Sequence, residues 1–201
     1  MLKTLALAAG LAISALVAAP AVHAEDTDTQ AAAMQQNMLK LQLPTGIVTI
    51  QMRPDLAPKH VERITTLANQ GFYDGIIFHR VIDGFMAQAG DPTGTGTSGS
   101  DLPNLEAEFT DEPYLKGTVG MARTQDRNGA NSQWFICFTD TSCSFLKGQY
   151  TVWGRVVSGM EHVNRIKKVQ PGGFGTKPRG ATPIIQMRTA DQFTATPTGA
   201  E

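Results

Sequence analysis

Residues 78–91 read FHRVIDGFMAQAGD, in which two short apolar segments lie on either side of Asp83-Gly84. Glycine accepts the positive φ that a tight turn requires, and Asp-Gly is a strong signal for a short hairpin turn. The pattern therefore predicts two strands, 78–82 and 85–89, that fold back on each other. This hairpin is the centre of the predicted fold.

The predicted turn brings Arg80 alongside Met86 and Gln88, with Phe85 at the start of the second strand. One permanent cation, two apolar side chains and one amide are thus expected close together. These groups include no general base, nucleophile or metal cluster, so any chemistry here would rest on hydrogen bonding, electrostatics and shape. The alternative is an ordinary barrel hairpin in which Arg80 snorkels or pairs with a carboxylate.

The segments on both sides of this hairpin add further strands and two helices. Alternating apolar residues over 38–52 surround a turn at Pro44-Thr45-Gly46 and predict a second hairpin. Residues 59–70 and 160–166 have the apolar spacing of helices. Further short strands are predicted at residues 106–109, 117–122, 132–139, 150–157 and 184–189.

About eight short strands with few parallel-type crossovers indicate a mainly β protein. A largely antiparallel sheet of this size avoids exposed edges best by closing on itself. We therefore expect a closed eight-stranded antiparallel barrel, capped by two α-helices that cover its open ends. This domain is expected to span residues 38–190, with residues 191–201 as a flexible polar tail.

Residues 91–104, DPTGTGTSGSDLPN, form a long segment rich in Gly, Ser and Thr. Within it, residues 94–99 match the G-x-G-x-x-G pattern of dinucleotide-binding folds. That motif needs a strand before it and a helix that begins directly after it. Ser100-Asp101-Leu102-Pro103 cannot begin such a helix and no βαβ pattern surrounds it, so we predict a flexible surface loop without a nucleotide.

Composition limits the possible partners. The chain has 201 residues, 41% of them hydrophobic, and a formal net charge of −1. This is typical of one domain with a normal core, and it offers no basic surface for nucleic acid. His60, His79 and His162 form no metal-ligand spacing. We expect no metal, no other cofactor and no nucleic-acid partner.

The N-terminus has the features of a cleavable export signal. Lys3 precedes an apolar segment, 5–19, that is shorter than a membrane span, and Val22-His23-Ala24 resembles a cleavage site. We expect a signal peptide at residues 1–24 and a flexible leader at 25–37; an uncleaved anchor is the alternative. The mature protein is then expected in a bacterial periplasm, with no membrane span after cleavage.

Two cysteines, Cys137 and Cys143, remain after this cleavage. An oxidising compartment permits a disulfide. Cys137, however, lies in the apolar segment WFICF, where a free cysteine commonly behaves as a small hydrophobic side chain. We expect two free thiols, although the sequence does not settle whether they pair.

Four long segments resemble the cyclophilin family of peptidyl-prolyl cis-trans isomerases, in particular its exported, single-domain bacterial members. They are APKHVERITTLANQGFYDG at 57–75, FHRVIDGFMAQAGD at 78–91, GTVGMARTQDRNGANSQWFIC at 117–137 and FLKGQYTVWGRVVSGM at 145–160. The resemblance covers about residues 38–190. It implies an eight-stranded antiparallel barrel with two helices, in agreement with the fold expected above.

The resemblance also implies a set of site residues, carried over by motif. Arg80 would be the catalytic arginine, and Gln88 would be the glutamine that acts with it on substrate carbonyls. The other positions would bind substrate: Phe85, Met86, Phe135 and Leu146 as walls of the proline pocket, Ala122 and Arg123 where the backbone clamps the peptide, Gln133 in the same groove, and Tyr150 at the pocket rim.

Three positions differ from the pattern of many family members. Arg123 stands in place of Asn, but we expect peptide binding to survive because the clamp there is mainly backbone. Tyr150 replaces a His and keeps an apolar body with a polar tip. Phe145 stands where many eukaryotic members have a Trp linked to tight cyclosporin binding, and it lacks the indole N–H donor. We therefore expect weak cyclosporin binding.

The function implied by the resemblance is peptidyl-prolyl cis-trans isomerisation during the folding of exported proteins. The partners would be proline-containing peptides and unfolded or partly folded exported proteins, and we expect a monomer. A guanidinium directed at the prolyl nitrogen would stabilise the twisted amide of the transition state. The alternative is a proline-peptide binding or chaperone module with little turnover, which would not need to keep Arg80.

Overall fold

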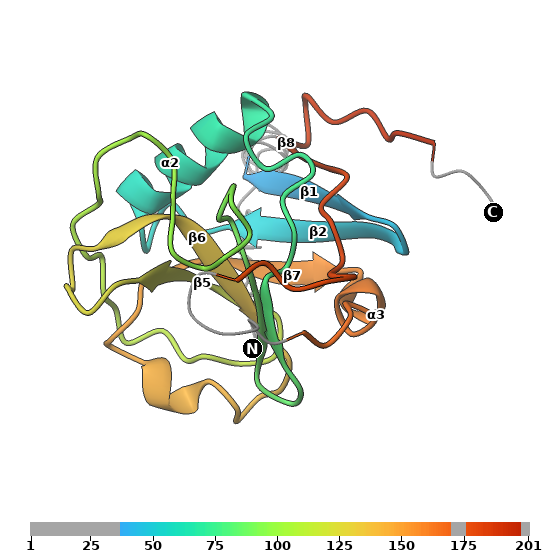
Figure 1. Ribbon diagram of the computed structural model, residues 1–201. Coiled ribbons are helices and arrows are strands. Elements are labelled where there is room, and N and C mark those ends of the chain that lie inside the picture. Colours follow the sequence, from blue (N-terminus) through green and yellow to red (C-terminus); the bar gives the residue numbers. More distant parts are fainter. Residues whose placement is uncertain (1–36, 170–175, 198–201) are drawn as a thin grey trace, which may run out of the picture.

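The computed structural model describes residues 37–169 and 176–197 (Figure 1). Its strands are β1 (Met38–Leu43), β2 (Gly46–Met52), β3 (Arg80–Ile82), β4 (Met86–Ala89), β5 (Thr118–Arg123), β6 (Ala130–Cys137), β7 (Val152–Ser158) and β8 (Gln186–Thr189). Its helices are α2 (Pro58–Asn69), α3 (Met160–Val163) and the short 3-10 helix η1 (Ser144–Leu146). The predicted signal peptide and nearly all of the predicted leader lie outside the described residues.

The eight strands form one antiparallel sheet in the order β3-β4-β6-β5-β7-β2-β1-β8. The mainly β, antiparallel prediction is confirmed, but the closed barrel is wrong: the sheet is a curled half-barrel that stays open between β3 and β8. These two strands are only three and four residues long, so they do not run alongside each other. The chain just before them meets instead, through an isolated bridge between Ile77 and Pro183.

The first hairpin, β1 and β2, forms as its alternating pattern predicts. Leu39 and Leu41 of β1 and Val48 and Ile50 of β2 are fully buried on one face. Gly46 opens β2 at a φ of 145°, a conformation that favours glycine. The predicted strand at 106–109 is absent, and the residue before it, Leu105, forms an isolated bridge with Ala130 of β6.

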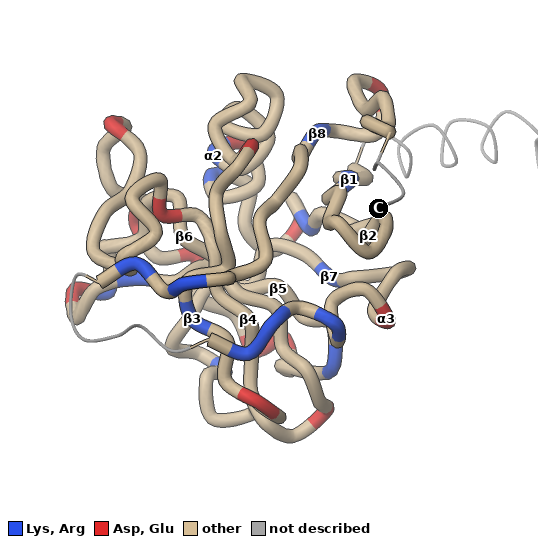
Figure 2. Tube along the Cα trace, turned by 45° about the vertical axis from the view of Figure 1, so that its right-hand side comes forward, with Lys and Arg blue, Asp and Glu red and all other residues tan. Residues whose placement is uncertain are grey.

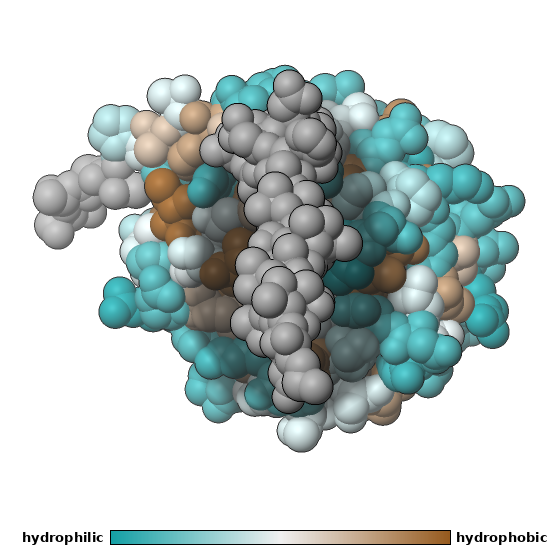
Figure 3. All heavy atoms as spheres, turned by 180° about the vertical axis from the view of Figure 1, so that it is seen from behind, coloured by the Kyte–Doolittle hydropathy of each residue, from teal (hydrophilic) through white to brown (hydrophobic). Residues whose placement is uncertain are grey.

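Aromatic side chains fill the centre of the half-barrel. Trp134 and Trp153 are fully buried and pack edge to face, with ring centroids 6.2 Å apart. Phe78 and Tyr73 also pack on Trp134 edge to face. On the face drawn in Figure 3, the visible surface of the described residues is mainly hydrophilic, with apolar patches among the hydrophilic atoms.

Helix α2 begins at Pro58, whose fixed φ suits the first turn, and Val61, Ile64 and Leu67 face the core. Its N-cap residue supplies no side-chain hydrogen bond. Glu108, distant in sequence, supplies it instead: its carboxylate accepts the backbone N–H groups of Lys59 and His60, each at 3.1 Å. The segment predicted to be a strand is thus used to cap a helix.

His60 makes folding sensitive to acid. Its ring is fully buried and its Nδ1 lies 2.6 Å from Glu108 Oε2. Burial, the largest cause, holds the pKa of His60 below its usual 6.5, although Glu108 acts in the opposite direction. Burial likewise lowers the pKa of His79. The unfolded chain therefore takes up these protons more readily than the folded chain.

We expect the free energy of unfolding to fall as the pH is lowered through the unfolded-state pKa, by up to about 1.4 kcal/mol per pH unit for each histidine. Thermal melts from about pH 8 to about pH 5 would show this as a falling Tm. The variant His60→Asn should have a flatter profile, because one of the two groups no longer titrates. A Tm that rises or stays level on acidification would contradict the prediction.

Helix α3 is shorter than the predicted 160–166, because after Val163 the backbone continues in tighter turns. The N–H groups of Arg165 and Ile166 donate to carbonyls three residues earlier. Val163 and Ile166 are buried as the spacing predicts. Helix α2 packs against β8, β7 and β6, whereas α3 packs against β2, and the two helices lie on opposite sides of the view in Figure 1. Neither is long and apolar enough for a transmembrane helix, and no other helix in the described ranges is.

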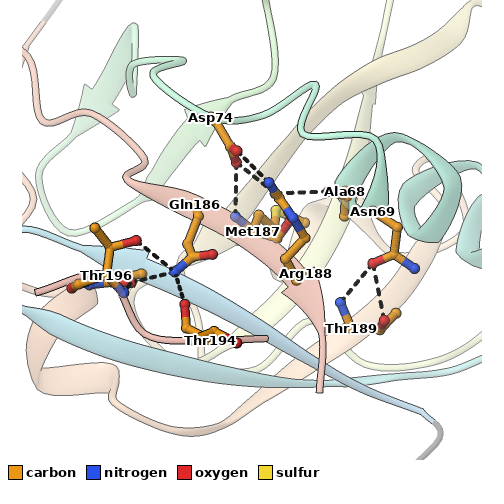
Figure 4. Close-up of polar contacts among 10 residues, drawn as sticks. Ala68, Asn69, Asp74, Gln186, Met187, Arg188, Thr189, Thr194 and Thr196 are labelled. Atoms are coloured by element: carbon orange, nitrogen blue, oxygen red, sulfur yellow. Dashed lines mark hydrogen bonds and ion pairs between the residues drawn. The ribbon is translucent and has the colours of Figure 1, made fainter. Parts of the chain in front are cut away.

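The segment predicted as a flexible tail contacts the sheet at Thr194 and Thr196 (Figure 4). The side-chain amide of Gln186 donates to the Thr194 carbonyl and the Thr196 hydroxyl, and Gln42 exchanges hydrogen bonds with the Thr196 backbone. Gln42 and Gln186 are themselves buried and joined at 2.8 Å. The segment thus supplies hydrogen-bond partners to the buried side-chain amides of Gln42 and Gln186.

Strand β8 ends the sheet, and side chains cover two of its backbone N–H groups (Figure 4). Met187 N–H donates to Asp74 Oδ1 at 3.3 Å, and Thr189 N–H donates to Asn69 Oδ1 at 3.1 Å. Asp74 is held in place by an ion pair with Arg188 of the same strand.

Candidate active site

The Asp83-Gly84 turn forms as predicted, and it sets Arg80 of β3 directly opposite Gln88 of β4. Arg80 Nη1 donates to Gln88 Oε1 at 3.3 Å. Gln88 Nε2 donates in turn to Gln133 Oε1 at 2.9 Å. The side-chain amides of Gln88 and Gln133 therefore have fixed orientations, and the hydrogen bond to Gln88 orients the guanidinium of Arg80.

The chain of amides ends on the glycine-rich loop. Gln133 Nε2 donates to the Ser98 carbonyl at 2.7 Å and to the Gly96 carbonyl at 3.2 Å. Because both carbonyls accept, the Gln133 oxygen must face Gln88. The loop thus determines how the site amides point.

Arg80 is half-buried, and it forms no ion pair with a carboxylate of the described residues. Burial, the largest cause, lowers the pKa of its guanidinium, whereas the nearby Tyr150 hydroxyl acts in the opposite direction. An arginine nevertheless stays protonated in proteins. The result is a permanent, uncompensated positive charge at the edge of an apolar space.

That space is a cavity of about 390 Å³. It brings together every predicted site residue except Gln133, and it adds Phe145. Its lining consists of Arg80, Phe85, Met86, Gln88, Ala122, Arg123, Phe135, Phe145, Leu146 and Tyr150. Six of the ten lining side chains are apolar, and the polar ones come from β3, β4, β5 and, for Tyr150, the segment between η1 and β7.

Phe135 forms the floor of this cavity between two tyrosines. Tyr114 stacks on it with ring centroids 6.0 Å apart and planes 15° apart, and Tyr150 meets it edge to face. The Tyr114 hydroxyl donates to the Tyr150 carbonyl at 3.0 Å. A Cβ on Gly120 would lie 2.5 Å from Phe135 Cζ, so only glycine leaves room for this ring.

Sequence reasoning missed Tyr114 and Gly120. Tyr114 lies in a segment without regular structure, and nothing local indicates that it is buried. Gly120 precedes Met121 inside a strand, and a glycine in a strand interior can mark a close approach of another group. The glycine inside this strand therefore indicates the close approach of the ring that forms the cavity floor.

A second cavity of about 470 Å³ adjoins the first, and the two share Gln88, Ala122 and Arg123. Gln133, absent from the first cavity, lines this one. Its lining consists of Gln88, Gly96, Thr97, Ser98, Gly99, Ser100, Asn104, Ala122, Arg123, Thr124, Gly129, Asn131 and Gln133. One continuous groove therefore contains all of the predicted site residues.

The glycine-rich loop on this groove is built around Asp91, which is fully buried. Its carboxylate accepts the backbone N–H groups of Thr93, Thr95, Gly96, Thr97 and Ser98. Burial alone would raise the pKa of Asp91, but these hydrogen bonds outweigh it and hold the pKa below its usual value. No helix follows the loop, as predicted, yet its backbone is anchored to a buried carboxylate.

Leu146 and Phe145 reach the cavity from η1, and a disulfide anchors the segment before it. Cys137 of β6 is bonded to Cys143, with Cα atoms 6.2 Å apart, so the expectation of free thiols is wrong. The turns at 139–143 bring Cys143 back to the end of β6, and a sequence separation of only 6 does not reveal this. Both sulfurs lie in the apolar cluster behind the cavity.

Loss of this disulfide is expected to lower the free energy of unfolding by about 2 kcal/mol, because the bond restricts a short loop in the unfolded chain. Urea unfolding of the double variant Cys137→Ala/Cys143→Ala, beside the oxidised wild type, would measure it. The variant should no longer respond to a reductant, whereas the wild type should. Equal midpoints for the variant and the oxidised wild type would contradict a stabilising role.

No group of three or more His, Cys, Asp or Glu side chains that could hold a metal ion occurs within residues 37–169 and 176–197. The groups that line the groove are the guanidinium groups of Arg80 and Arg123, side-chain amides, hydroxyls, backbone and aromatic rings. They can bind a peptide, hold an apolar ring and present positive charge to one atom.

Comparison with known proteins agrees with this arrangement. The family model described as "Cyclophilin type peptidyl-prolyl cis-trans isomerase/CLD" matches residues 38–189, which runs from the start of β1 to the end of β8. The chain belongs to the cyclophilin family of peptidyl-prolyl cis-trans isomerases.

Curated relatives and solved structures support the same family. A probable peptidyl-prolyl cis-trans isomerase of Brucella suis is 51% identical over 168 residues, which is 77% of this chain and 85% of the relative. A peptidyl-prolyl cis-trans isomerase-like 1 of Aspergillus fumigatus is 35% identical over 150 residues, 73% and 91% of the two chains. A Cryptosporidium parvum cyclophilin, crystallised in the presence of the dipeptide Ala-Pro, is similar with a TM-score of 0.66 and 26% identity, over 76% of this chain and 98% of that one.

Proposed function

We propose that this protein catalyses cis-trans isomerisation of X-Pro bonds in exported proteins, with Arg80 and Gln88 as its catalytic pair. The observation that carries the proposal is the uncompensated guanidinium of Arg80 at the edge of an apolar cavity of about 390 Å³. A cavity of this kind accepts a pyrrolidine ring, and the membership of the chain in the isomerase family gives the reaction.

The reaction has to overcome the partial double bond of the peptide C–N link, a barrier of about 18–20 kcal/mol. When that bond twists, conjugation is lost and the prolyl nitrogen becomes pyramidal and more basic. Arg80 can donate an N–H to this nitrogen only in the twisted state, so it stabilises the transition state more than either ground state. The apolar wall formed by Phe85, Met86 and Phe135 strengthens this interaction by excluding water.

The side-chain amides can hold one part of the substrate in place while the X-Pro bond rotates. Gln88 lies between Arg80 and Gln133, so its side chain is positioned to hold a substrate carbonyl while the other side of the bond turns. Ala122 and Arg123 line both cavities at the end of β5, where their backbone can bind an extended peptide. The Cryptosporidium parvum relative crystallised with Ala-Pro supports proline as the residue recognised.

We place the protein in a bacterial periplasm, cleaved after Ala24. Two observations support this. Residues 1–24 have the pattern of an export signal. The Cys137–Cys143 disulfide is of a kind that forms and persists in oxidising compartments. Fractionation of cells that produce the protein, with N-terminal sequencing of the mature chain, would test both parts of this assignment.

The test of the activity is the cis-to-trans rate of a short Ala-Pro peptide with and without the purified protein. Strong acceleration, at low concentrations of protein, is the expected result. If the folded protein binds the peptide and leaves the rate unchanged, it is a binding or chaperone module and the enzymatic proposal fails.

Weak cyclosporin binding remains a prediction. Phe145 packs on Phe85 with ring centroids 5.6 Å apart, but it is 62% exposed and offers no N–H donor. Inhibition should therefore need far more than nanomolar cyclosporin, and the variant Phe145→Trp should bind it more tightly. A nanomolar dissociation constant for the wild type would contradict this.

A further inference from the structure

We propose that the side chain of Arg123 makes the groove select X-Pro substrates that carry an acidic side chain near the proline. This inference rests on the proposed isomerase function and adds a substrate class to it. The backbone of Arg123 was expected to clamp the peptide, whereas the role proposed here belongs to the guanidinium.

Arg123 lies at the junction of the groove, because it lines both cavities. Its guanidinium carbon is 4.6 Å from the ring centroid of Tyr150 and 5.9 Å from that of Phe109. Its Nε donates to the Gln149 carbonyl at 3.0 Å, and its Nη1 donates to the Thr124 carbonyl at 2.9 Å. The charge is therefore held in one place beside the pocket.

All of these partners are neutral. The contacts of Arg123 use Nε, Nη1 and the face of the guanidinium, and no described residue accepts a hydrogen bond from Nη2. The Nη2 edge of the fork is thus available for a substrate oxygen. A carboxylate suits this edge because it can accept a charge-assisted hydrogen bond from a planar donor group.

The charge balance of the groove points the same way. Arg80 and Arg123 line it, and none of the described lining residues is acidic. Asp126, on the nearby loop, accepts the Asn128 backbone N–H and lines neither cavity. The protein as a whole carries a net charge of −1, and Figure 2 shows acidic and basic positions spread over the trace. The positive groove is therefore a local feature.

The effect should be moderate, because Arg123 is partly exposed. Exposed ion pairs change an equilibrium by about two- to fivefold at most, and salt weakens them. We expect kcat/KM for a peptide with a nearby Glu to exceed that for the matching Gln peptide by this factor. The matching Lys peptide should be the poorest substrate, because its ammonium meets two fixed cations.

The experiment uses two peptide series around a common Ala-Pro bond. One series has Glu, Gln or Lys two positions before the proline, and the other has them two positions after it. Since the residue that precedes proline is always Ala, the uncatalysed barrier stays matched within each series. Rates and peptide dissociation constants are measured at low and at high salt.

Three variants test whether the side chain of Arg123 causes the preference for Glu over Gln. Arg123→Gln should remove the preference for Glu over Gln, measured as a ratio within the variant so that any change in overall activity cancels. Arg123→Lys should restore part of it, because the charge returns without the fork. Arg127→Gln is the matched control: this arginine lies 4.9 Å over the same Phe109 ring but lines neither cavity, so the wild-type ratio should persist.

Equal rates and equal affinities for the Glu and Gln peptides in the wild type would overturn this inference and leave the isomerase proposal intact. A preference that survives in Arg123→Gln would also overturn it, because the side chain would not be its cause. If no peptide is turned over, the isomerase proposal fails, and the dissociation constants of the same peptides still decide whether Arg123 selects acidic ones.

Discussion

Replacement of Arg80 by Ala is expected to lower kcat/KM for an X-Pro peptide by about 10²–10³-fold, the loss seen when one transition-state donor is removed. The expectation follows from the geometry of the site. Arg80 carries the charge directed at the apolar cavity, and Gln88 holds it in place. Because the guanidinium acts on the twisted state, the loss should appear in kcat more than in KM.

Two controls separate chemistry from folding in this experiment. Arg155→Ala removes an exposed arginine from β7 that does not line the cavity, and it should keep the wild-type rate. Arg80→Lys keeps a charge but loses the rigid fork, and it should recover only a small part of the activity. An Arg80→Ala variant that keeps nearly full activity would refute the electrostatic mechanism, and peptide binding without turnover would support it.

Replacement of Asp91 by Ala is expected to destabilise the protein by about 3–5 kcal/mol, because several hydrogen bonds to a buried charge are lost together. The N–H groups released would be those of Thr93, Thr95, Gly96, Thr97 and Ser98. The same change should reduce activity, since Gln133 depends on the carbonyls of Gly96 and Ser98 for its orientation.

Urea unfolding and peptide turnover of the same samples would measure both effects. Asp101→Ala is the matched control, because Asp101 is exposed in the same segment. Asp91→Asn keeps the size but not the charge and should be intermediate. The pKa of Asp91 is lowered in the folded state, so its stabilisation is complete at neutral pH and is lost as the pH falls through that lowered value. An Asp91→Ala variant as stable as Asp101→Ala would contradict this account.

The sequence was sufficient for the parts of the site that depend on local pattern. The Asp83-Gly84 turn determines a two-strand register, and the register alone places Arg80 opposite Gln88. The alternation in β1 and β2 likewise determines which of their side chains are buried. The family resemblance added Phe135, Leu146 and Tyr150, which come from other strands and loops and which no local pattern could have joined to Arg80.

What the sequence did not reveal depends on contacts between distant segments. Tyr114 supports Phe135 from a segment without regular structure, and Glu108 caps a helix far from it in the chain. Asp91 begins the segment that was predicted as a flexible surface loop, and nothing in the glycine-rich residues after it indicates a buried carboxylate. The prediction of a closed barrel was wrong for a similar reason. The number of strands does not specify whether β3 and β8 are long enough to pair with each other.

The open sheet leaves β8 as an edge, and exposed edges invite pairing with strands of other molecules, which leads to aggregation. Asn69 and Asp74 accept the N–H groups of Thr189 and Met187, the positions that an incoming strand would use. Because these two side chains already occupy the N–H groups at the edge, they hinder the pairing of β8 with a strand of a second molecule. Concentrated solutions of the protein should remain clear where an Asn69→Ala/Asp74→Ala variant, still folded, forms aggregates.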